Sequence, residues 1–261
     1  MLIINNVSVK RGVKTCVNNV SARFRAGQFT ALVGPNGAGK SSLLKAICGE
    51  WPRSSGNVLI NGIDSTKLAA KERAKMMAVM PQHPRISFDF RVHELVRLGR
   101  SPHSIHQVDS ENDVIDYCLQ IAGLEGYAQR GVLTLSGGEL QRVYLAKAIA
   151  QISTKAAILP GKNTVLLLDE PTSALDMAQQ LTAMNGLREI ARNGGTVVAV
   201  MHDLNLVSCF ADHVLLMQDA EVLEQGAPEQ VLQPKNLKDC FGCNVWVDKR
   251  ASDKKVIVSV G

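Results

Sequence analysis

The stretch GPNGAGKSS carries residue types that bind phosphate. It has the spacing G-x-x-x-x-G-K-S and lies between the apolar run FTALV and residues with helical periodicity. Glycines allow backbone N–H groups to point at phosphate oxygens, and the positive end of a helix dipole adds to this attraction. In such a loop the lysine reaches the β- and γ-phosphates, and the hydroxyl after it ligates Mg²⁺. The predicted phosphate site comprises Gly34, Pro35, Asn36, Gly37, Ala38, Gly39, Lys40, Ser41 and Ser42.

An acidic pair follows a second apolar run, in TVLLLDEPTSALD. The run has the length and composition of a buried strand, and it ends at Asp169 and Glu170. Beside a phosphate loop, one carboxylate can hold Mg²⁺ and another can polarise the attacking water. We assign the metal to Asp169, together with Ser41, and the water to Glu170. The alternative for such a pair is capping of the next helix.

Two further polar residues end apolar runs. Gln82 ends MMAVMPQ, and His202 ends TVVAVMH. Because parallel sheets place ligand groups at the carboxyl ends of their strands, we expect both side chains to sense the γ-phosphate, with Gln82 also near the metal. The catalytic set is therefore predicted as Glu170, His202, Gln82 and Lys40. The alternative for His202 is a polar residue before a helix that Asp203 caps.

The stretch LSGGELQR is a second glycine-bearing turn. Ser136 and Glu139 form the S-x-x-E capping box that starts a helix. A capped helix does not require Gly137 and Gly138, which lower helix stability. Two glycines leave the first amides uncovered, as an approaching anion requires. We therefore predict a second phosphate-contacting surface, apart from Lys40.

The elements that position these residues alternate between strands and helices. The stretches LIINNVSV, VNNVSARF and FTALVG alternate like antiparallel strands, and residues 83–153 are mostly helical in pattern. After AAILPGKNT, the alternation of strand and helix resumes, which is typical of a parallel sheet covered by helices. We predict one α/β domain over 1–261. Residues 1–82 and 154–261 form its core, and 83–153 form an inserted helical subdomain.

Composition limits the class of protein. The 261 residues include 29 basic and 24 acidic ones, and this net charge of +5 is too small and scattered to indicate nucleic-acid binding. No apolar run reaches the roughly 18 residues of a membrane span, and the amino terminus lacks a signal-peptide pattern. Of six cysteines only Cys240 and Cys243 are close, which favours reduced structural thiols over a zinc site.

Taken together, the motifs resemble those of the ATP-binding-cassette ATPases over essentially the whole chain. GPNGAGKSS resembles the Walker A loop, MPQ the Q-loop, LSGGELQR the signature, TVLLLDE Walker B, SALD the D-loop and MHD the switch histidine. The resemblance implies a P-loop NTPase (RecA-like) core with an N-terminal antiparallel β-subdomain, and ATP and Mg²⁺ as cofactors. It also implies a head-to-tail homodimer, in which Ser136, Gly137 and Gly138 of one copy close over the other copy's ATP. Asp176 would lie in the crossing loop.

One position departs from the family pattern. Members usually carry an aromatic residue that stacks on adenine just before the glycine of the first hairpin, whereas VSVKRG places Arg11 before Gly12. A guanidinium plane can stack on a base, so Arg11 is the predicted adenine contact.

A segment after the Q-loop indicates which group within the family the chain resembles. SFDFRVHELVRLGRSPH and HDLNL resemble importers of ferric siderophores, cobalamin and haem, and AKMMAVMPQH and AAILPGKN look most like haem-import ATPases. This implies two polytopic membrane permease subunits, a periplasmic substrate-binding protein as an indirect partner, and a peripheral position on the cytoplasmic face of the inner membrane. A non-transport cassette ATPase is the main alternative, and a P-loop kinase a weaker one. Direct haem ligation is not expected of the histidines at His83, His93, His103 and His106.

Overall fold

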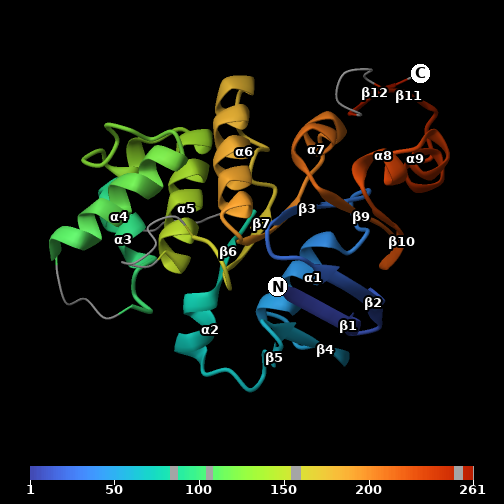
Figure 1. Ribbon diagram of the computed structural model, residues 1–261, viewed down its shortest axis with the longest axis horizontal. Coiled ribbons are helices and arrows are strands. Elements are labelled where there is room, and N and C mark those ends of the chain that lie inside the picture. The colour runs from blue at the N-terminus through green and yellow to red at the C-terminus, as the bar shows by residue number, and fades with distance from the viewer. Residues whose placement is uncertain (83–87, 104–107, 154–159, 250–254, 261) are drawn as a thin grey trace.

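The computed structural model describes residues 1–82, 88–103, 108–153, 160–249 and 255–260. Figure 1 shows a central sheet with helices above it and at both ends, and a smaller sheet below. The strands are β1 (Leu2–Arg11), β2 (Lys14–Phe24), β3 (Gln28–Val33), β4 (Ser55–Ile60), β5 (Ile63–Asp64), β6 (Met77–Met80), β7 (Val165–Asp169), β8 (Thr196–Val200), β9 (His213–Gln218), β10 (Glu221–Gly226), β11 (Val245–Lys249) and β12 (Val256–Val260). The helices are α1 (Lys40–Cys48), α2 (Ala70–Met76), α3 (Val92–Leu98), α4 (Val108–Ile121), the 3₁₀ turn η1 (Val132–Thr134), α5 (Gly137–Ile152), α6 (Met177–Arg192), α7 (Leu204–Phe210), α8 (Pro228–Val231) and α9 (Pro234–Phe241).

The core sheet has the order β10-β9-β3-β8-β7-β6, and all of its neighbours are parallel except β10 and β9. The prediction that FTALVG pairs antiparallel with the amino-terminal strands is wrong. This segment forms β3, which lies between β8 and β9 as a parallel strand. Every residue of this strand from Phe29 to Val33 is buried, so both of its faces are covered. A strand covered on both faces has a continuous apolar run, which is typical of parallel sheets.

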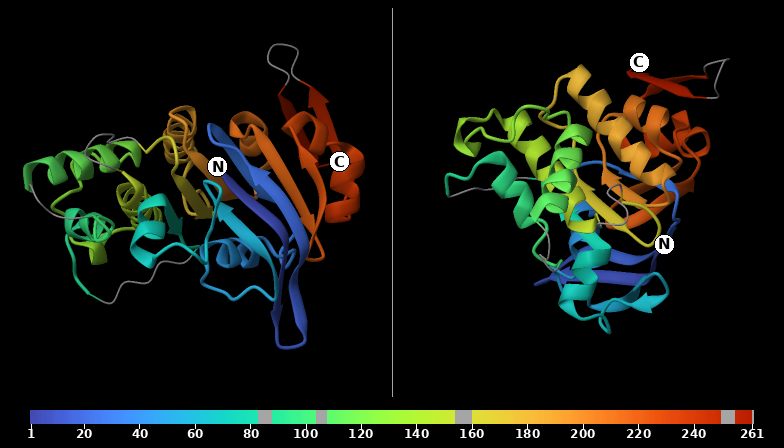
Figure 2. Two further views of the ribbon diagram at one scale, coloured as in Figure 1. Left: turned by 60° about the horizontal axis from the view of Figure 1, so that its bottom comes forward. Right: turned by 60° about the vertical axis from the view of Figure 1, so that its left-hand side comes forward.

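The amino-terminal sheet has the order β2-β1-β4-β5 and is antiparallel. Its inner face and α1 share one hydrophobic cluster with one face of the core sheet. The other face of the core sheet packs against α5 and α6 in a second cluster. The β1–β2 hairpin projects from the body of the molecule (Figure 2, left). The α/β core with an antiparallel amino-terminal sheet is therefore confirmed.

Helices α3, α4 and α5 pack together beside the core and include the signature turn (Figure 1). The predicted subdomain boundaries at residues 83 and 154 lie outside the described residues, as do His83, His106 and the first half of the AAILPGKN loop. His93 contacts the Ala128 carbonyl oxygen through Nδ1 at 3.0 Å, and His103 contacts the Gln151 carbonyl oxygen through Nε2 at 2.8 Å.

Arg100, from the G-R-x-P-H segment, is a buried structural residue with 1% exposure. Its guanidinium donates to Glu111 at 2.8 Å, and to the carbonyl oxygens of Ala150 at 2.8 Å and Ser153 at 2.6 Å. Gly99 beside it allows α3 to approach α5, since a Cβ atom there would overlap the Lys147 carbonyl oxygen. The segment that distinguishes the importer group therefore joins three helices of the subdomain.

Candidate functional site: a nucleotide pocket with one open side

The phosphate loop forms as its glycines predict. Gly34 has φ 149° and Gly39 has φ 101°, a region of φ that favours glycine. At both positions a Cβ atom would overlap a carbonyl oxygen, that of Met217 for Gly34 and that of Cys16 for Gly39. Helix α1 starts directly after Gly39 with no side-chain cap among the described residues, so its first amides face the loop.

Lys40 fills the loop with its ammonium group. Its Nζ donates to the carbonyl oxygens of Gly34 at 2.8 Å and Pro35 at 2.9 Å. Burial lowers the pKa of Lys40, while the negative charges of Glu170 and Asp169 act in the opposite direction. A phosphate anion in the loop offers this partly desolvated cation a charged partner in place of two neutral carbonyls.

Ser41 and Asp169 lie together and can hold a hard cation. The Ser41 hydroxyl donates to Asp169 Oδ1 at 3.0 Å. Burial raises the pKa of Asp169, and the hydrogen bond from Ser41 opposes that rise. Burial disfavours the charged carboxylate, and a bound cation would compensate for this. A carboxylate beside a hydroxyl suits Mg²⁺, which takes oxygen ligands together with nucleotide phosphates. Gln82 lines the same small cavity as Ser41 and Asp169, so its position fits the predicted metal role.

Glu170 is the centre of a polar cluster. Gln82 Nε2 donates to its Oε1 at 2.5 Å, and His202 Nε2 lies 2.8 Å from the same oxygen. Burial alone raises the pKa of Glu170, but the hydrogen bonds from His202 and Gln82 outweigh it, and the pKa is lowered overall. The side chain therefore stays ionised and can accept a proton or a hydrogen bond from water.

The structure confirms the capped helix that was the alternative for His202, and it also places the His202 side chain beside Glu170. Asp203 caps α7 by accepting from the amides of Asn205 at 2.8 Å and Leu206 at 3.0 Å. The cap fixes where the strand β8 ends and the helix begins, and His202 projects from that junction to Glu170. The two roles are therefore compatible, and the sensing of the γ-phosphate by His202 stays a prediction.

Sequence reasoning missed Gln141, which is 4% exposed on α5. Its Nε2 donates to the Glu170 carbonyl oxygen at 2.6 Å, and its Oε1 accepts from the Ala174 amide at 3.2 Å. Glu170 has φ 54°, which is unfavourable for a residue with a side chain, and this hydrogen bond helps to hold it there. The only sequence signal was a polar residue on the buried side of a helix.

These residues surround a cavity of about 270 Å³ at the phosphate loop. It is lined by Lys14, Cys16, Asn36, Gly37, Gly39, Lys40, Ser41, Ser42, Gln82 and Glu170. The signature residues 136–138 and the D-loop residue Asp176 are not among the described residues that line it. One chain therefore provides the loop, Gln82 and Glu170 of this cavity, while its own residues 136–138 and Asp176 lie elsewhere.

The signature turn has the predicted capping box. The Glu139 amide donates to Ser136 Oγ at 3.2 Å, and the Ser136 amide donates to Glu139 Oε2 at 2.7 Å. A Cβ atom on Gly138 would lie 2.6 Å from the Ala174 carbonyl oxygen, whereas no described atom lies within 4 Å of one on Gly137. Packing therefore explains why residue 138 is glycine, but it does not explain the glycine at residue 137. The exposed Asp176 caps α6 by accepting from the Gln179 amide at 2.8 Å.

Arg11 lies outside this cavity. Its guanidinium stacks on the Trp51 ring, 4.3 Å from the ring centroid, while Lys14 and Cys16 of β2 line the pocket next to the loop. Its contact with adenine stays a prediction.

Comparison with known proteins gives matches over most of the chain. The model of the ABC transporter family matches residues 17–173. The hemin import ATP-binding protein HmuV of Rhizobium meliloti (strain 1021) is 42% identical over 95% of this chain and 93% of its own, and that of Pseudomonas aeruginosa (strain PAO1) is 40% identical over 95% of both. Among solved structures, the dimeric post-hydrolysis cassette MJ0796 with ADP and Pi has a TM-score of 0.75 and 26% identity over 87% of this chain and 99% of that one. A transporter assigned to the metal-chelate type, in an inward-facing conformation, has a TM-score of 0.78 and 25% identity over 100% of this chain and 96% of that one.

Proposed function

The chain belongs to the ABC transporter family of ATP-binding subunits, and from that premise we propose that it drives the import of haem by hydrolysing ATP in a head-to-tail dimer. The observation that supports this most directly is that one chain forms only part of the site, which we call the half-site. Lys40, Ser41 and Glu170 line the cavity at the phosphate loop, and the open Gly137 turn lies elsewhere on the chain. A second copy, related by a two-fold axis, can bring its own turn to the open side.

Each residue of the half-site has a role in the reaction. The loop amides and Lys40 bind the β- and γ-phosphates, and Ser41 and Asp169 hold Mg²⁺, which neutralises charge on the phosphates. Glu170 orients and polarises the attacking water, and Gln82 and His202 keep its carboxylate ionised and directed toward the pocket. The signature amides of the partner copy then cover the γ-phosphate, so that the dimer closes with ATP and loosens after hydrolysis.

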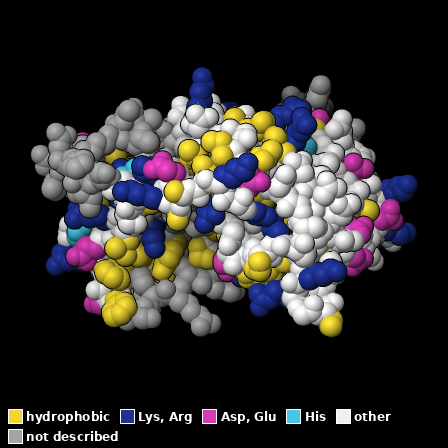
Figure 3. Space-filling view, turned by 90° about the horizontal axis from the view of Figure 1, so that it is seen from below, with side chains coloured by type: hydrophobic (Ala, Val, Ile, Leu, Met, Phe, Trp, Pro, Cys, Tyr) yellow, Lys and Arg dark blue, Asp and Glu magenta, His cyan; other side chains and the backbone are white. Residues whose placement is uncertain are grey.

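The position at the membrane comes from partner proteins in this proposal. Among the described residues no helix is long and apolar enough to cross a bilayer. Hydrophobic side chains are exposed on the face seen in Figure 3. Phe88, shortly before α3, is 72% exposed, and Leu133 of η1 is 60% exposed. Two polytopic permease subunits dock on this part of the dimer at the cytoplasmic face of the inner membrane, and a periplasmic protein delivers the substrate to them.

Haem is the preferred substrate because the named relatives are hemin import proteins at 40–42% identity. Ferric siderophores and cobalamin remain the alternatives within the importer group, and a non-transport ATPase is the alternative outside it. Co-purification in detergent with a polytopic membrane protein supports transport, and its absence favours the non-transport class. In liposomes containing the purified complex and its binding protein, haem should stimulate ATP hydrolysis. Stimulation by a siderophore or cobalamin alone contradicts the haem assignment.

The split site has a direct test in mixed dimers. Ser136→Arg blocks the signature, and Lys40→Ala empties the phosphate loop, so neither variant alone forms an intact composite site. A mixed dimer has one intact site, built from Lys40 of one chain and Ser136 of the other. ATPase activity should therefore appear on mixing and peak at equal amounts. A mixture no more active than its separate components contradicts the proposal.

A further inference from the structure

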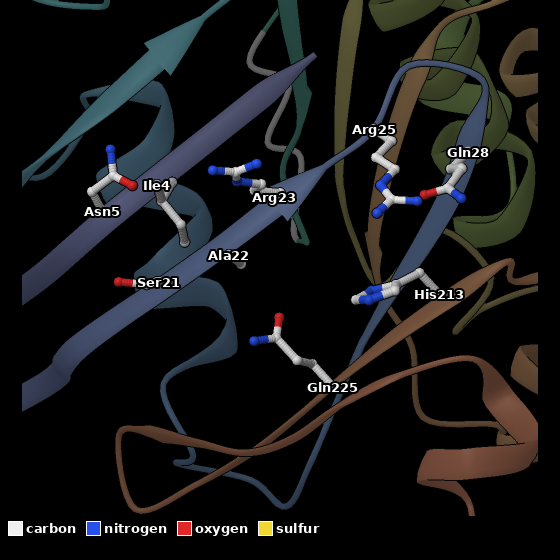
Figure 4. Close-up of a pocket in the computed structure, with 9 residues that line it drawn as sticks. All are labelled: Ile4, Asn5, Ser21, Ala22, Arg23, Arg25, Gln28, His213 and Gln225. Carbon is white, nitrogen blue, oxygen red and sulfur yellow. The ribbon is translucent and has the colours of Figure 1, made fainter.

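A second cavity, of about 400 Å³, opens where the core strands begin (Figure 4). Gln28 is the first residue of β3 and His213 the first of β9, whereas the phosphate loop follows the end of β3. The two cavities share none of the described residues that line them. The residues lining this one, called the basal cleft below, are Ile4, Asn5, Ser21, Ala22, Arg23, Arg25, Gln28, His213 and Gln225.

The basal cleft is positively charged. Arg23, near the end of β2, and Arg25, just after it, both line the cleft, along with Ser21. Among the described residues neither arginine forms an ion pair, and the lining contains no Asp or Glu. Asp212 is the chain neighbour of His213, but its Oδ2 accepts a hydrogen bond from the Phe29 amide at 2.9 Å. The two guanidinium groups are thus available to an anion.

His213 adds an unused polar atom. Its Nδ1 is buried and has no hydrogen-bond partner among the described residues, which is uncommon for a buried nitrogen. Burial lowers the pKa of His213, and the nearby charge of Arg25 lowers it further. In Figure 4 the His213 ring and the Gln225 amide extend into the space between their strands and β2. A ligand with oxygen acceptors can accept from the Gln225 amide directly, and from His213 Nδ1 once the ring turns toward the cleft, since that nitrogen is buried as the ring stands.

We propose that the basal cleft binds a small oxyanion with two or more negative charges, held by Arg23, Arg25 and His213. Guanidinium groups match the planar geometry of phosphate and carboxylate oxygens, and the amides of Gln28 and Gln225 supply further donors. The volume lies at the lower end of the roughly 300–1,000 Å³ found for small-molecule sites. The ligand class is therefore a phosphorylated or polycarboxylate metabolite, distinct from the nucleotide in the main pocket.

Isothermal titration of the full chain tests this site. The titration uses the Lys40→Ala chain, in which the main phosphate loop is disabled, because a nucleotide used to fill that loop would also supply a diphosphate to the basal cleft. Inorganic pyrophosphate and citrate are then titrated separately, and at least one should bind with one site per chain. Tighter binding of pyrophosphate identifies a phosphoryl ligand, and tighter binding of citrate a carboxylate ligand. The proposal is overturned if neither anion shows saturable binding at roughly 10 mM. A dissociation constant above that concentration means that the binding free energy is weaker than about 3 kcal/mol.

Matched variants locate the binding. Arg23→Gln combined with Arg25→Gln should lower the affinity for the tighter-binding anion by roughly tenfold or more, because hydrogen bonds between charged groups are lost. Both arginines are exposed, so the fold should be retained. Lys71→Gln removes one charge from the exposed start of α2 and should change the affinity by less than about twofold. Equal binding by the double variant and the native chain, or an equal effect of Lys71→Gln, indicates general attraction to a basic surface and overturns the site.

Discussion

The side-chain amide of Gln141 donates a 2.6 Å hydrogen bond to the main-chain carbonyl oxygen of Glu170. The helix that starts with the signature turn therefore holds the residue that we propose as the catalytic carboxylate. The same Gln141 side chain accepts from the Ala174 amide, at the start of the D-loop. The buried side-chain amide of Gln141 thus connects the signature helix, Glu170 and the D-loop.

Gln141→Ala should lower kcat on the order of 10- to 100-fold and leave ATP affinity nearly unchanged. The variant loses the bond that holds Glu170 at φ 54°, and small displacements of a catalytic group have effects of this size. The Glu170 carboxylate itself remains, and Lys40 still binds phosphate. Single-turnover hydrolysis and nucleotide titration separate the two quantities.

Gln151→Ala is the matched control for this prediction. Gln151 lies on the same helix and donates to the carbonyl oxygens of Ala74 at 2.9 Å and Met77 at 3.0 Å, away from Glu170. Loss of these bonds should cost stability comparable to that lost in Gln141→Ala, about 1–3 kcal/mol. A similar fall in kcat in both variants attributes the effect to stability and refutes a positioning role for Gln141.

Glu170→Gln should bind ATP and hydrolyse it roughly 100-fold or more slowly, because an amide cannot accept the proton of the attacking water. Tight nucleotide binding with near-normal turnover contradicts its assignment as the catalytic carboxylate. The measurement is phosphate release from the purified chain, with bound ATP quantified in parallel.

His202→Ala should shift the acidic limb of the kcat profile to higher pH. In the native chain the pKa of Glu170 is below its ordinary value of 4.5, since hydrogen bonds from His202 and Gln82 outweigh the rise due to burial. Removal of His202 leaves that rise less opposed, so the pKa of Glu170 increases and its carboxylate protonates sooner as pH falls. An unchanged acidic limb, measured under saturating ATP, argues against this coupling.

Asp169→Asn should stabilise the nucleotide-free fold by on the order of 1 kcal/mol while abolishing Mg²⁺-dependent hydrolysis. Burial raises the pKa of Asp169 above 3.8, so the folded chain holds that proton more tightly than the unfolded chain. The charged form therefore destabilises the fold above the raised pKa, and this loss disappears as pH falls toward 3.8. Chemical denaturation of both chains at several pH values should give a difference that shrinks in acid. A variant less stable at neutral pH contradicts the argument.

The motifs were predictable because their chemistry depends on short spacing along the chain. The phosphate loop, the Ser136–Glu139 capping box and the acidic pair each need only neighbouring residues and one flanking element. Gln141 was not predictable in this way, because its partner Glu170 is 29 residues away and is reached only through tertiary packing. The placement of β3 between β8 and β9 likewise depends on partners far along the chain.

The C-terminal elements show the same limit. Strand β12 joins α7 through side-chain bonds, with Asn205 Oδ1 accepting from the Val258 amide at 2.8 Å and Ser208 Oγ from the Val256 amide at 2.8 Å. Neither residue forms a pattern that the sequence reveals. Local motifs therefore gave the chemistry of the site, while the contacts that hold its parts in register required the structure.

Gly137 and Gly138 are adjacent in the signature turn, and substitutions at them test binding and packing separately. Gly138→Ala should lower the melting temperature, because its Cβ would lie 2.6 Å from the Ala174 carbonyl oxygen. Gly137→Ala should leave the melting temperature nearly unchanged, since no described atom lies within 4 Å of its Cβ position.

Gly137→Ala should nevertheless reduce ATPase activity, because the added methyl group stands where the partner's γ-phosphate must approach the helix amides. The loss should persist after correction for any change in stability, since no described atom lies within 4 Å of the added methyl group. Full activity in Gly137→Ala at wild-type stability means that the turn contacts no phosphate. In that case the open side of the pocket is covered by another part of the partner copy.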